Sequence, residues 1–171
     1  MEDSGVDHLC QELRSENCKL EKLHLSCCGL TSRCCSALSS SLSAPQSQLT
    51  ELDLCSNNNM EDSGVDQLCE GLRSENCKLE KLNLSFCGLT SRCSSSLSSI
   101  FSSPHSQLTE LNRNKLRDPG ARQLCEGLWT PNCKLKTLRL SRNEIGESEK
   151  TNLRSLQDEL NRTGRQVNIK I

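Results

Sequence analysis

Residues 18–31 read CKLEKLHLSCCGLT, and residues 77–90 read CKLEKLNLSFCGLT. The two stretches belong to a longer repeat, because residues 1–53 match residues 60–112 at a fixed offset of 59, with 41 of 53 positions identical. A third, more diverged copy begins at Asp118. Repetition on this scale predicts a stack of similar units, each packed on its neighbours, rather than one mixed core.

A shorter unit of 27 to 30 residues recurs inside each copy and follows the pattern L-x-x-L-x-L-x-x-N/C-x-L. Because side chains alternate along a strand, the second and third leucines of the pattern point to the same side of a short strand. The leading leucines are Leu20, Leu49, Leu79, Leu108 and Leu135. Each is expected to open a strand that pairs in parallel with the strands of the neighbouring units.

The remainder of each unit has the spacing of an amphipathic helix. Val65, Leu68, Cys69 and Leu72 fall at i, i+3, i+4 and i+7, and Cys93, Leu97 and Phe101 fall at i, i+4 and i+8. Asp62-Ser63 and Thr90-Ser91 are predicted to supply the N-caps of these helices. No unit can bury its leucines alone, so the strands should form one layer and the helices another.

An Asn or Cys follows the third leucine at a fixed distance in most units. Its side chain is expected to turn inward and to hydrogen-bond backbone groups where the chain leaves the strand. These ladder positions are Cys28, Asn57, Cys87 and Asn143.

The fourth unit departs from the pattern, because LTELNRNKL from Leu108 lacks two residues. Aligned from its first leucine, the unit has Arg113 where the third leucine belongs, and a buried Arg would be costly. A shortened strand near residues 108–112 is therefore predicted, with Arg113 turned out to solvent.

The composition excludes several classes of function. The chain has 171 residues, 33% of them hydrophobic, and a net charge of -1. Such a polar chain would be suspected of disorder, but its 29 leucines fall in register. No segment is apolar enough for a membrane helix, and no basic block marks a nucleic-acid site. The first residues do not resemble a signal peptide. We therefore expect binding to neither a membrane nor a nucleic acid, and we expect a cytoplasmic location.

The repeats resemble the ribonuclease-inhibitor subtype of leucine-rich repeats, as found in NACHT-containing NOD-like receptors of innate immunity. The stretch DSGVDQLCEGLRSENCKLEKLNLSFCGLT is especially similar to the expanded receptors of fish. The resemblance implies an α/β solenoid, a right-handed arc with parallel strands on its concave face and helices on its convex face. Residues 1–146 are expected to form the repeats, the first truncated, and residues 147–171 a terminal helix and strand.

The resemblance implies a non-catalytic module that binds a protein partner or the receptor's own NACHT region. The alternatives are a freestanding inhibitor of the ribonuclease-inhibitor type and a non-functional receptor fragment. The sequence contains no G-x-x-x-x-G-K-[ST], G-x-S-x-G or H-E-x-x-H motif, so no enzymatic activity and no cofactor are expected.

His24, Cys27, Cys28, Cys34 and Cys35 have a spacing that could suggest zinc. The repeat provides an internal control, because the second copy keeps only the counterparts of Cys28 and Cys34. Those two thiols therefore follow the structural rule of the repeat, and no metal is expected. Most of the 13 cysteines recur in register, which favours buried structural thiols over redox chemistry.

Outward positions of the strands should form rows across the concave face. One row, Lys22, Glu51, Lys81, Glu110 and Thr137, alternates in charge and is expected to neutralise itself. The next row varies between otherwise similar copies, and an exposed Phe and Arg nearby are residue types that anchor protein interfaces. The candidate partner-binding residues are His24, Asp53, Asn83, Phe86, Asn112, Arg139 and Arg142.

Overall fold

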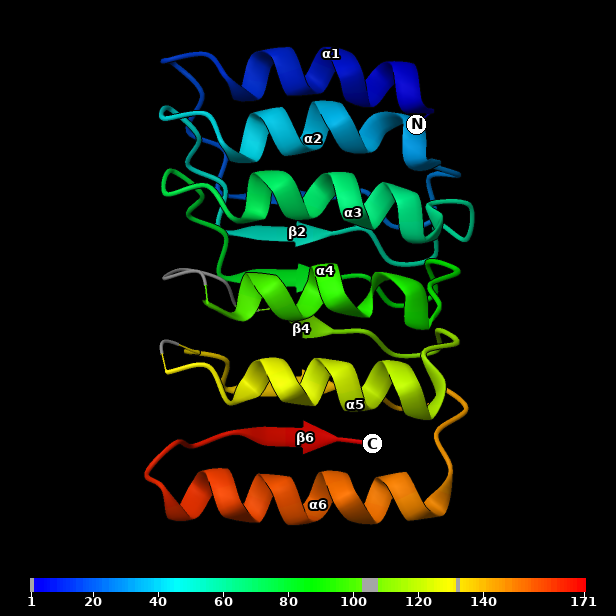
Figure 1. The fold of residues 1–171 in the computed structure, drawn as a ribbon. Helices are drawn as coiled ribbons and strands as arrows, with labels where there is room; N and C mark the ends of the chain where they lie inside the picture. Colours follow the sequence, from blue (N-terminus) through cyan, green and yellow to red (C-terminus); the bar gives the residue numbers. More distant parts are fainter. Residues whose placement is uncertain (1, 103–107, 132) are drawn as a thin grey trace.

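The structure, a computed structural model, describes residues 2–102, 108–131 and 133–171. Its elements alternate between two layers, a sheet and a row of helices that covers one side of it (Figure 1). The strands are β1 (Lys22–His24), β2 (Glu51–Asp53), β3 (Lys81–Asn83), β4 (Leu108–Glu110), β5 (Thr137–Arg139) and β6 (Asn168–Lys170). The α-helices are α1 (Asp3–Leu13), α2 (Cys35–Leu42), α3 (Glu61–Leu72), α4 (Ser94–Ser99), α5 (Arg117–Leu128) and α6 (Glu147–Arg162). Short 3₁₀ helices are η1 (Ser32–Cys34), η2 (Ser91–Cys93) and η3 (Ile100–Ser102).

The six strands pair in parallel and in chain order, from β1 to β6. Each connection carries the chain through the helix layer and back to the next position in the sheet (Figure 1). Packed helices lie about 8–10 Å apart and paired strands about 4.8 Å apart, so such a stack curves with its strands on the inner side. The predicted α/β leucine-rich-repeat solenoid is confirmed.

One continuous apolar core runs between the two layers and consists largely of leucine. The predicted helix stripes face it: Val65, Leu68, Cys69 and Leu72 are at most 3% exposed, and Cys93, Leu97 and Phe101 are fully buried. Leu20 is 38% exposed although its counterparts Leu49, Leu79 and Leu135 are 2–3% exposed, because Leu20 belongs to the first of the described units and, within residues 2–102, 108–131 and 133–171, has a neighbouring unit on one side alone.

The register of the fourth unit corrects the prediction made for it. Leu111, not Arg113, takes the position of the third leucine, and it is fully buried. β4 has three residues like every other strand, and the irregularity is a shift in register opposite Leu82 and Asn83. One step from Leu82 to Asn83 is matched by two steps from Leu108 to Glu110, and from Glu110 onward the strand is shifted by two residues from the predicted alignment, a shift that keeps each side chain on the same face. Arg113 is exposed, as predicted.

The ladder side chains hold backbone groups of two units at once. Asn57 is fully buried, and its Oδ1 accepts from the amides of Cys28 and Leu30, at 3.1 and 3.0 Å. Its Nδ2 donates to the carbonyls of Leu25 and Leu54, at 2.9 and 2.8 Å. Each bond to the preceding unit satisfies a polar group that the strand has left unpaired.

Asn114 makes the same set of four bonds, at 2.9 to 3.1 Å, between the third and fourth units. The sequence pattern missed it because the leading leucine of the fourth unit suggests another alignment. Asn143 donates to the carbonyls of Leu111 and Leu140. The Sγ atoms of Cys28 and Cys87 donate to carbonyls of the same turn, in line with their ladder positions.

The predicted N-cap at Asp62 is wrong, whereas that at Thr90 is confirmed. α3 already begins at Glu61, and the carboxylate of Asp62 instead accepts from the amide and hydroxyl of Thr90 in the next unit. Thr90 in turn accepts from the amide of Arg92 and caps η2. Asp3 accepts from the amide and hydroxyl of Thr31, and Asp118 accepts from the amide of Gly146, so each aspartate ties neighbouring units together.

The C-terminal segment adds α6 and β6 to the stack. Leu153 and Leu160 of α6 are buried, and Ile169 of β6 faces the core. Gly164 follows the helix with a φ of +87°, a left-handed conformation that glycine adopts without strain.

At Gly71, α3 packs closely against the backbone of α2. A Cβ atom at this position would lie 2.3 Å from the carbonyl oxygen of Ser39 in α2. Alanine usually stabilises a helix by about 1 kcal/mol relative to glycine, but here Gly71→Ala is expected to lower the free energy of unfolding by about 1–3 kcal/mol. Urea unfolding measures this, with Glu70→Ala on the exposed side of α3 as the control. A more stable Gly71→Ala variant would contradict the packing described here.

Candidate protein-interaction face

The outward side chains of the six strands form one surface, called here the sheet face. Its first row contains Lys22, Glu51, Lys81, Thr137 and Asn168. Its second row contains His24, Asp53, Asn83, Glu110, Arg139 and Lys170. In β1, β2, β3, β5 and β6, the first-row residue and the second-row residue flank a buried leucine or isoleucine, because side chains alternate along a strand.

The predicted composition of the rows needs two corrections. Glu110 pairs with Asn83 and Arg139, so it belongs to the second row and not to the first. Asn112 lies beyond the strand, beside Ser141, whose amide it accepts at 3.0 Å. The two-residue slip of the fourth unit moves both residues. The other candidate residues lie on this face or at its edge, at the ends of their strands.

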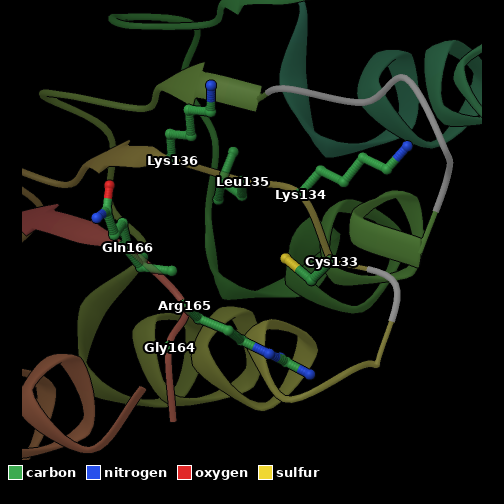
Figure 2. A pocket seen from close by; sticks show the side chains of 8 residues that line it. Cys133, Lys134, Leu135, Lys136, Gly164, Arg165 and Gln166 are labelled. Carbon is green, nitrogen blue, oxygen red and sulfur yellow. The ribbon is translucent and has the colours of Figure 1, made fainter. Parts of the chain in front are cut away.

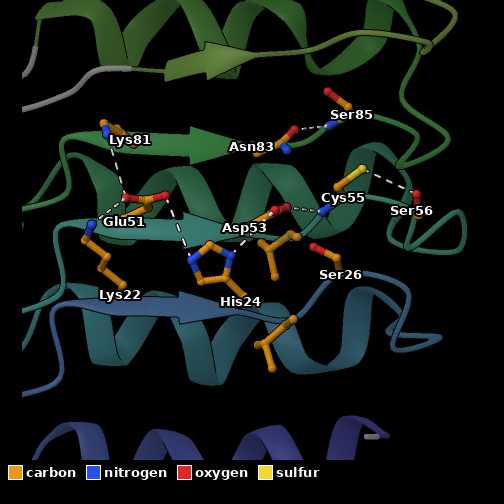
Figure 3. A network of polar contacts seen from close by, with 12 residues as sticks. Lys22, His24, Ser26, Glu51, Asp53, Cys55, Ser56, Lys81, Asn83 and Ser85 are labelled. Carbon is orange, nitrogen blue, oxygen red and sulfur yellow. Dashed lines mark hydrogen bonds and ion pairs between the residues drawn. The ribbon is translucent and has the colours of Figure 1, made fainter.

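The half of the sheet face formed by β1 to β3 neutralises its own charge (Figure 3). Glu51 lies between Lys22 and Lys81, with its Oε2 at 3.6 and 3.7 Å from their Nζ atoms. His24 lies 3.9 Å from the carboxylates of both Glu51 and Asp53. The alternating pairs expected for the first row are confirmed between Glu51 and its two lysines. Such exposed pairs contribute less than about 1 kcal/mol each and keep the surface polar.

A third set of side chains stands at the edge of the sheet face, one residue before each ladder position. Its members are Cys27, Ser56, Phe86, Arg113 and Arg142, and all have φ between 55° and 62°. The left-handed backbone recurs at each unit, and the side chains there are free to differ. The guanidinium of Arg113 lies over the ring of Phe86, 4.7 Å from its centroid. The position of Arg113 could have been found by counting back from Asn114 instead of forward from Leu108.

The structure separates the residues of the zinc-like spacing. Cys34 and Cys35 are fully buried in the helix layer, whereas Cys27 is exposed at the edge of the sheet face. The neighbours of His24 are carboxylates, not thiols. Within the described part of the chain, no group of three or more His, Cys, Asp or Glu side chains could hold a metal ion.

A separate hollow of about 570 Å³ lies where β5 and the last segment begin (Figure 2). Lys134, Lys136 and Arg165 contribute basic side chains to its lining. The guanidinium of Arg165 donates to the carbonyl of Leu128 at the end of α5, at 2.7 Å. Arg165 therefore fastens the last segment to the helix layer.

On the helix side, Trp129 at the end of α5 is 43% exposed and lines a hollow of about 250 Å³ against α6. Its counterparts in the other units are Arg14 and Arg73. None of the helices in the described ranges has the length and apolar character needed to cross a membrane.

Comparison with known proteins identifies the repeats. A family model described as "Leucine Rich repeat" matches residues 16–39, 47–69, 75–92 and 132–148. The chain is a leucine-rich-repeat solenoid. It is 46% identical over 158 residues to the bovine "NACHT, LRR and PYD domains-containing protein 3" and 42% identical over 139 residues to the mouse "Ribonuclease inhibitor". It is also 39% identical over 144 residues to the mouse "NACHT, LRR and PYD domains-containing protein 14".

These alignments cover most of this solenoid but small parts of the relatives. They take in 92%, 81% and 84% of the chain, against 15%, 30% and 14% of the relatives in the same order. Its repeats are thus similar both to those of a ribonuclease inhibitor and to those of proteins named for NACHT, LRR and PYD domains.

Proposed function

We propose that this solenoid is the leucine-rich-repeat region of a cytoplasmic NACHT-containing receptor of innate immunity, where it binds protein and catalyses no reaction. The 46% identity to a NACHT, LRR and PYD protein over 92% of the chain supports this proposal most strongly. The binding surface we propose is the sheet face, including its edge. Its second row carries a different residue in each strand, while the leucine that directly follows it is retained from β1 to β5, as expected of a rigid scaffold that presents variable side chains.

The partner we propose first is the NACHT region of the same receptor, and a separate protein is the alternative. A photo-crosslinking amino acid in place of His24 tests whether the sheet face contacts the partner. The matched control carries the same amino acid in place of Glu70, on the exposed side of α3. The purified chain is mixed with the NACHT region of the bovine relative. Crosslinks from position 24 and none from position 70 are expected. The reverse pattern would place binding on the helix side, and no crosslink from either position would contradict binding to NACHT.

A freestanding enzyme inhibitor is the second candidate, favoured by the 42% identity to mouse ribonuclease inhibitor. The test is a titration of pancreatic ribonuclease with the purified chain. If the receptor proposal holds, ribonuclease activity is expected to stay within about 10% of the untreated enzyme at a tenfold molar excess of the chain. Stoichiometric inhibition would favour the second candidate instead.

A further inference from the structure

The two halves of the sheet face differ in how their charges are paired. In the half formed by β1 to β3, Glu51 lies between two lysines and His24 lies between two carboxylates. In the other half, Arg139 pairs with Glu110, with 3.4 Å between Nε and Oε1. Within the described part of the chain, Arg113, Arg142 and Lys170 make no ion pair. The chain carries a net charge of -1, so this local excess of cations is not a general property of its surface.

These cations line one hollow. It has a volume of about 240 Å³ at the C-terminal ends of the last strands. Arg139 and Lys170 reach it from the second row of the sheet face, and Arg113 and Arg142 from the edge. The polar side chains of Asn112 and Ser141 complete the lining. Four cationic side chains thus converge from three neighbouring units, and one of them, Arg139, is paired with the carboxylate of Glu110.

The backbone fixes where the two edge arginines stand. Arg113 and Arg142 have φ of 55° and 58° and occupy equivalent turns of adjacent units. The amide of Arg113 donates to the carbonyl of Ser141, at 2.8 Å, which ties the two turns together. The guanidinium carbon of Arg113 lies over the ring of Phe86, 4.7 Å from its centroid, and this cation–π contact helps to hold the guanidinium in place.

This arrangement suits carboxylates of a protein segment. A guanidinium binds a carboxylate through two parallel hydrogen bonds, and several cations in one hollow favour a run of acidic residues over a single one. Phe86 is 36% exposed beside the hollow, and an aromatic next to arginines is typical of the centre of a protein interface. A nucleic acid needs a longer basic track than three strands, which span about 10 Å across the sheet.

We propose that the hollow lined by Arg113, Arg139, Arg142 and Lys170 binds an acidic segment of a protein partner through its carboxylates. The inference rests on the proposed use of the sheet face for protein binding and names the chemistry of the partner at this end of it. The half formed by β1 to β3 then serves as a neutral flank, because its charges are already paired.

The test measures the binding of a fluorescein-labelled octa-glutamate peptide to the full chain by fluorescence anisotropy at 50 mM salt. The double variant Arg113→Gln/Arg142→Gln is expected to bind at least tenfold more weakly. The matched control is Lys22→Gln/Lys81→Gln, which removes the same charge from the same face and is expected to change the affinity less than twofold. Arg113→Lys/Arg142→Lys keeps the charge but not the planar fork, so an intermediate loss of about threefold is expected.

Three results would overturn the inference: no binding of octa-glutamate to the unmodified chain, equal losses in the two glutamine variants, or tighter binding of an eight-nucleotide DNA strand at the same hollow. Circular dichroism melts establish that each variant is folded. If Arg113→Gln/Arg142→Gln does not fold, Lys170→Gln takes its place. The outcome is separable from the proposed function. If position 24 crosslinks to NACHT but the peptide does not bind, only this inference fails. If the peptide binds but position 24 gives no crosslink, the proposed NACHT partner fails and the inference about the basic hollow stands.

Discussion

Asn57→Ala is expected to lower the free energy of unfolding by about 4–6 kcal/mol. The substitution removes four hydrogen bonds, three of them buried and one partly buried, and leaves two amides and two carbonyls without the partner that Asn57 provides. Each unsatisfied buried group costs about 1–3 kcal/mol, and some of that cost is relieved as the turn relaxes. Because domains of this size are stable by only about 5–15 kcal/mol, much of the variant is expected to be unfolded at 37 °C.

Urea unfolding followed by circular dichroism measures the effect, with two further variants beside it. Asn57→Cys is expected to lose less than Asn57→Ala, because Cys87 occupies the equivalent position and its Sγ donates to the carbonyl of Leu54 at 3.2 Å. Asn58→Ala, at the exposed neighbouring residue, is expected to change stability by less than about 0.5 kcal/mol. If Asn57→Ala and Asn58→Ala unfold at the same urea concentration, the ladder does not stabilise the stack.

Raising the pH from 7.5 to 10 is expected to cost at least about 4 kcal/mol of stability. Burial raises the pKa of Cys69, Cys87 and Cys125 to about 12, from 9.0 in the unfolded chain. A thiol whose pKa is raised by folding stabilises the fold at pH values below 9, and that contribution is lost as the pH rises toward 12. At pH 10 each of the three thiols accounts for about 1.4 kcal/mol of the loss.

The measurement is urea unfolding at a series of pH values between 7.5 and 10. The matched variant is Cys69→Ala/Cys125→Ala, which removes two of the three thiols. It is less stable at pH 7.5, but it is expected to lose about 3 kcal/mol less than the unmodified chain between the two pH values. An unchanged pH dependence would show that these thiols ionise equally in both states, contrary to their burial.

The sequence predicts the architecture well because the same leucine pattern recurs in several units. Leu52 and Leu54, for example, alternate with Glu51 and Asp53, and a period of two leaves no doubt about which side chains face the core. Burial follows directly from such spacing. The helix stripe from Val65 to Leu72 is equally clear, since its spacing fits a helix and no other element.

The sequence fails where two alignments satisfy the same pattern. In the fourth unit, a strand shifted by two residues has the same alternation, so only the stacked neighbours decide that Leu111 is the third leucine. The role of Asp62 differs from the predicted cap for a similar reason. An aspartate at the start of a helix suggests a cap, and its contact with Thr90 depends on a unit 28 residues away.

The candidate site was predictable to the extent that it follows strand alternation. His24, Asp53 and Asn83 were assigned to the sheet face from spacing alone. The spacing does not point to Arg113 or Lys170, because Arg113 lies in the unit with the shifted register and Lys170 in the terminal segment. Their convergence on one hollow is a property of how units stack, and no single unit encodes it.

The slipped register of the fourth unit has a consequence for how genes of this kind change. Loss of six nucleotides within a strand leaves the alternation of side chains intact, so a neighbouring leucine can fill the core and the fold survives. Loss of three nucleotides would reverse the alternation and bury polar side chains. Among deletions that preserve the reading frame, selection should therefore tolerate pairs of codons in the strands more often than single ones, and each tolerated pair places new side chains on the surface.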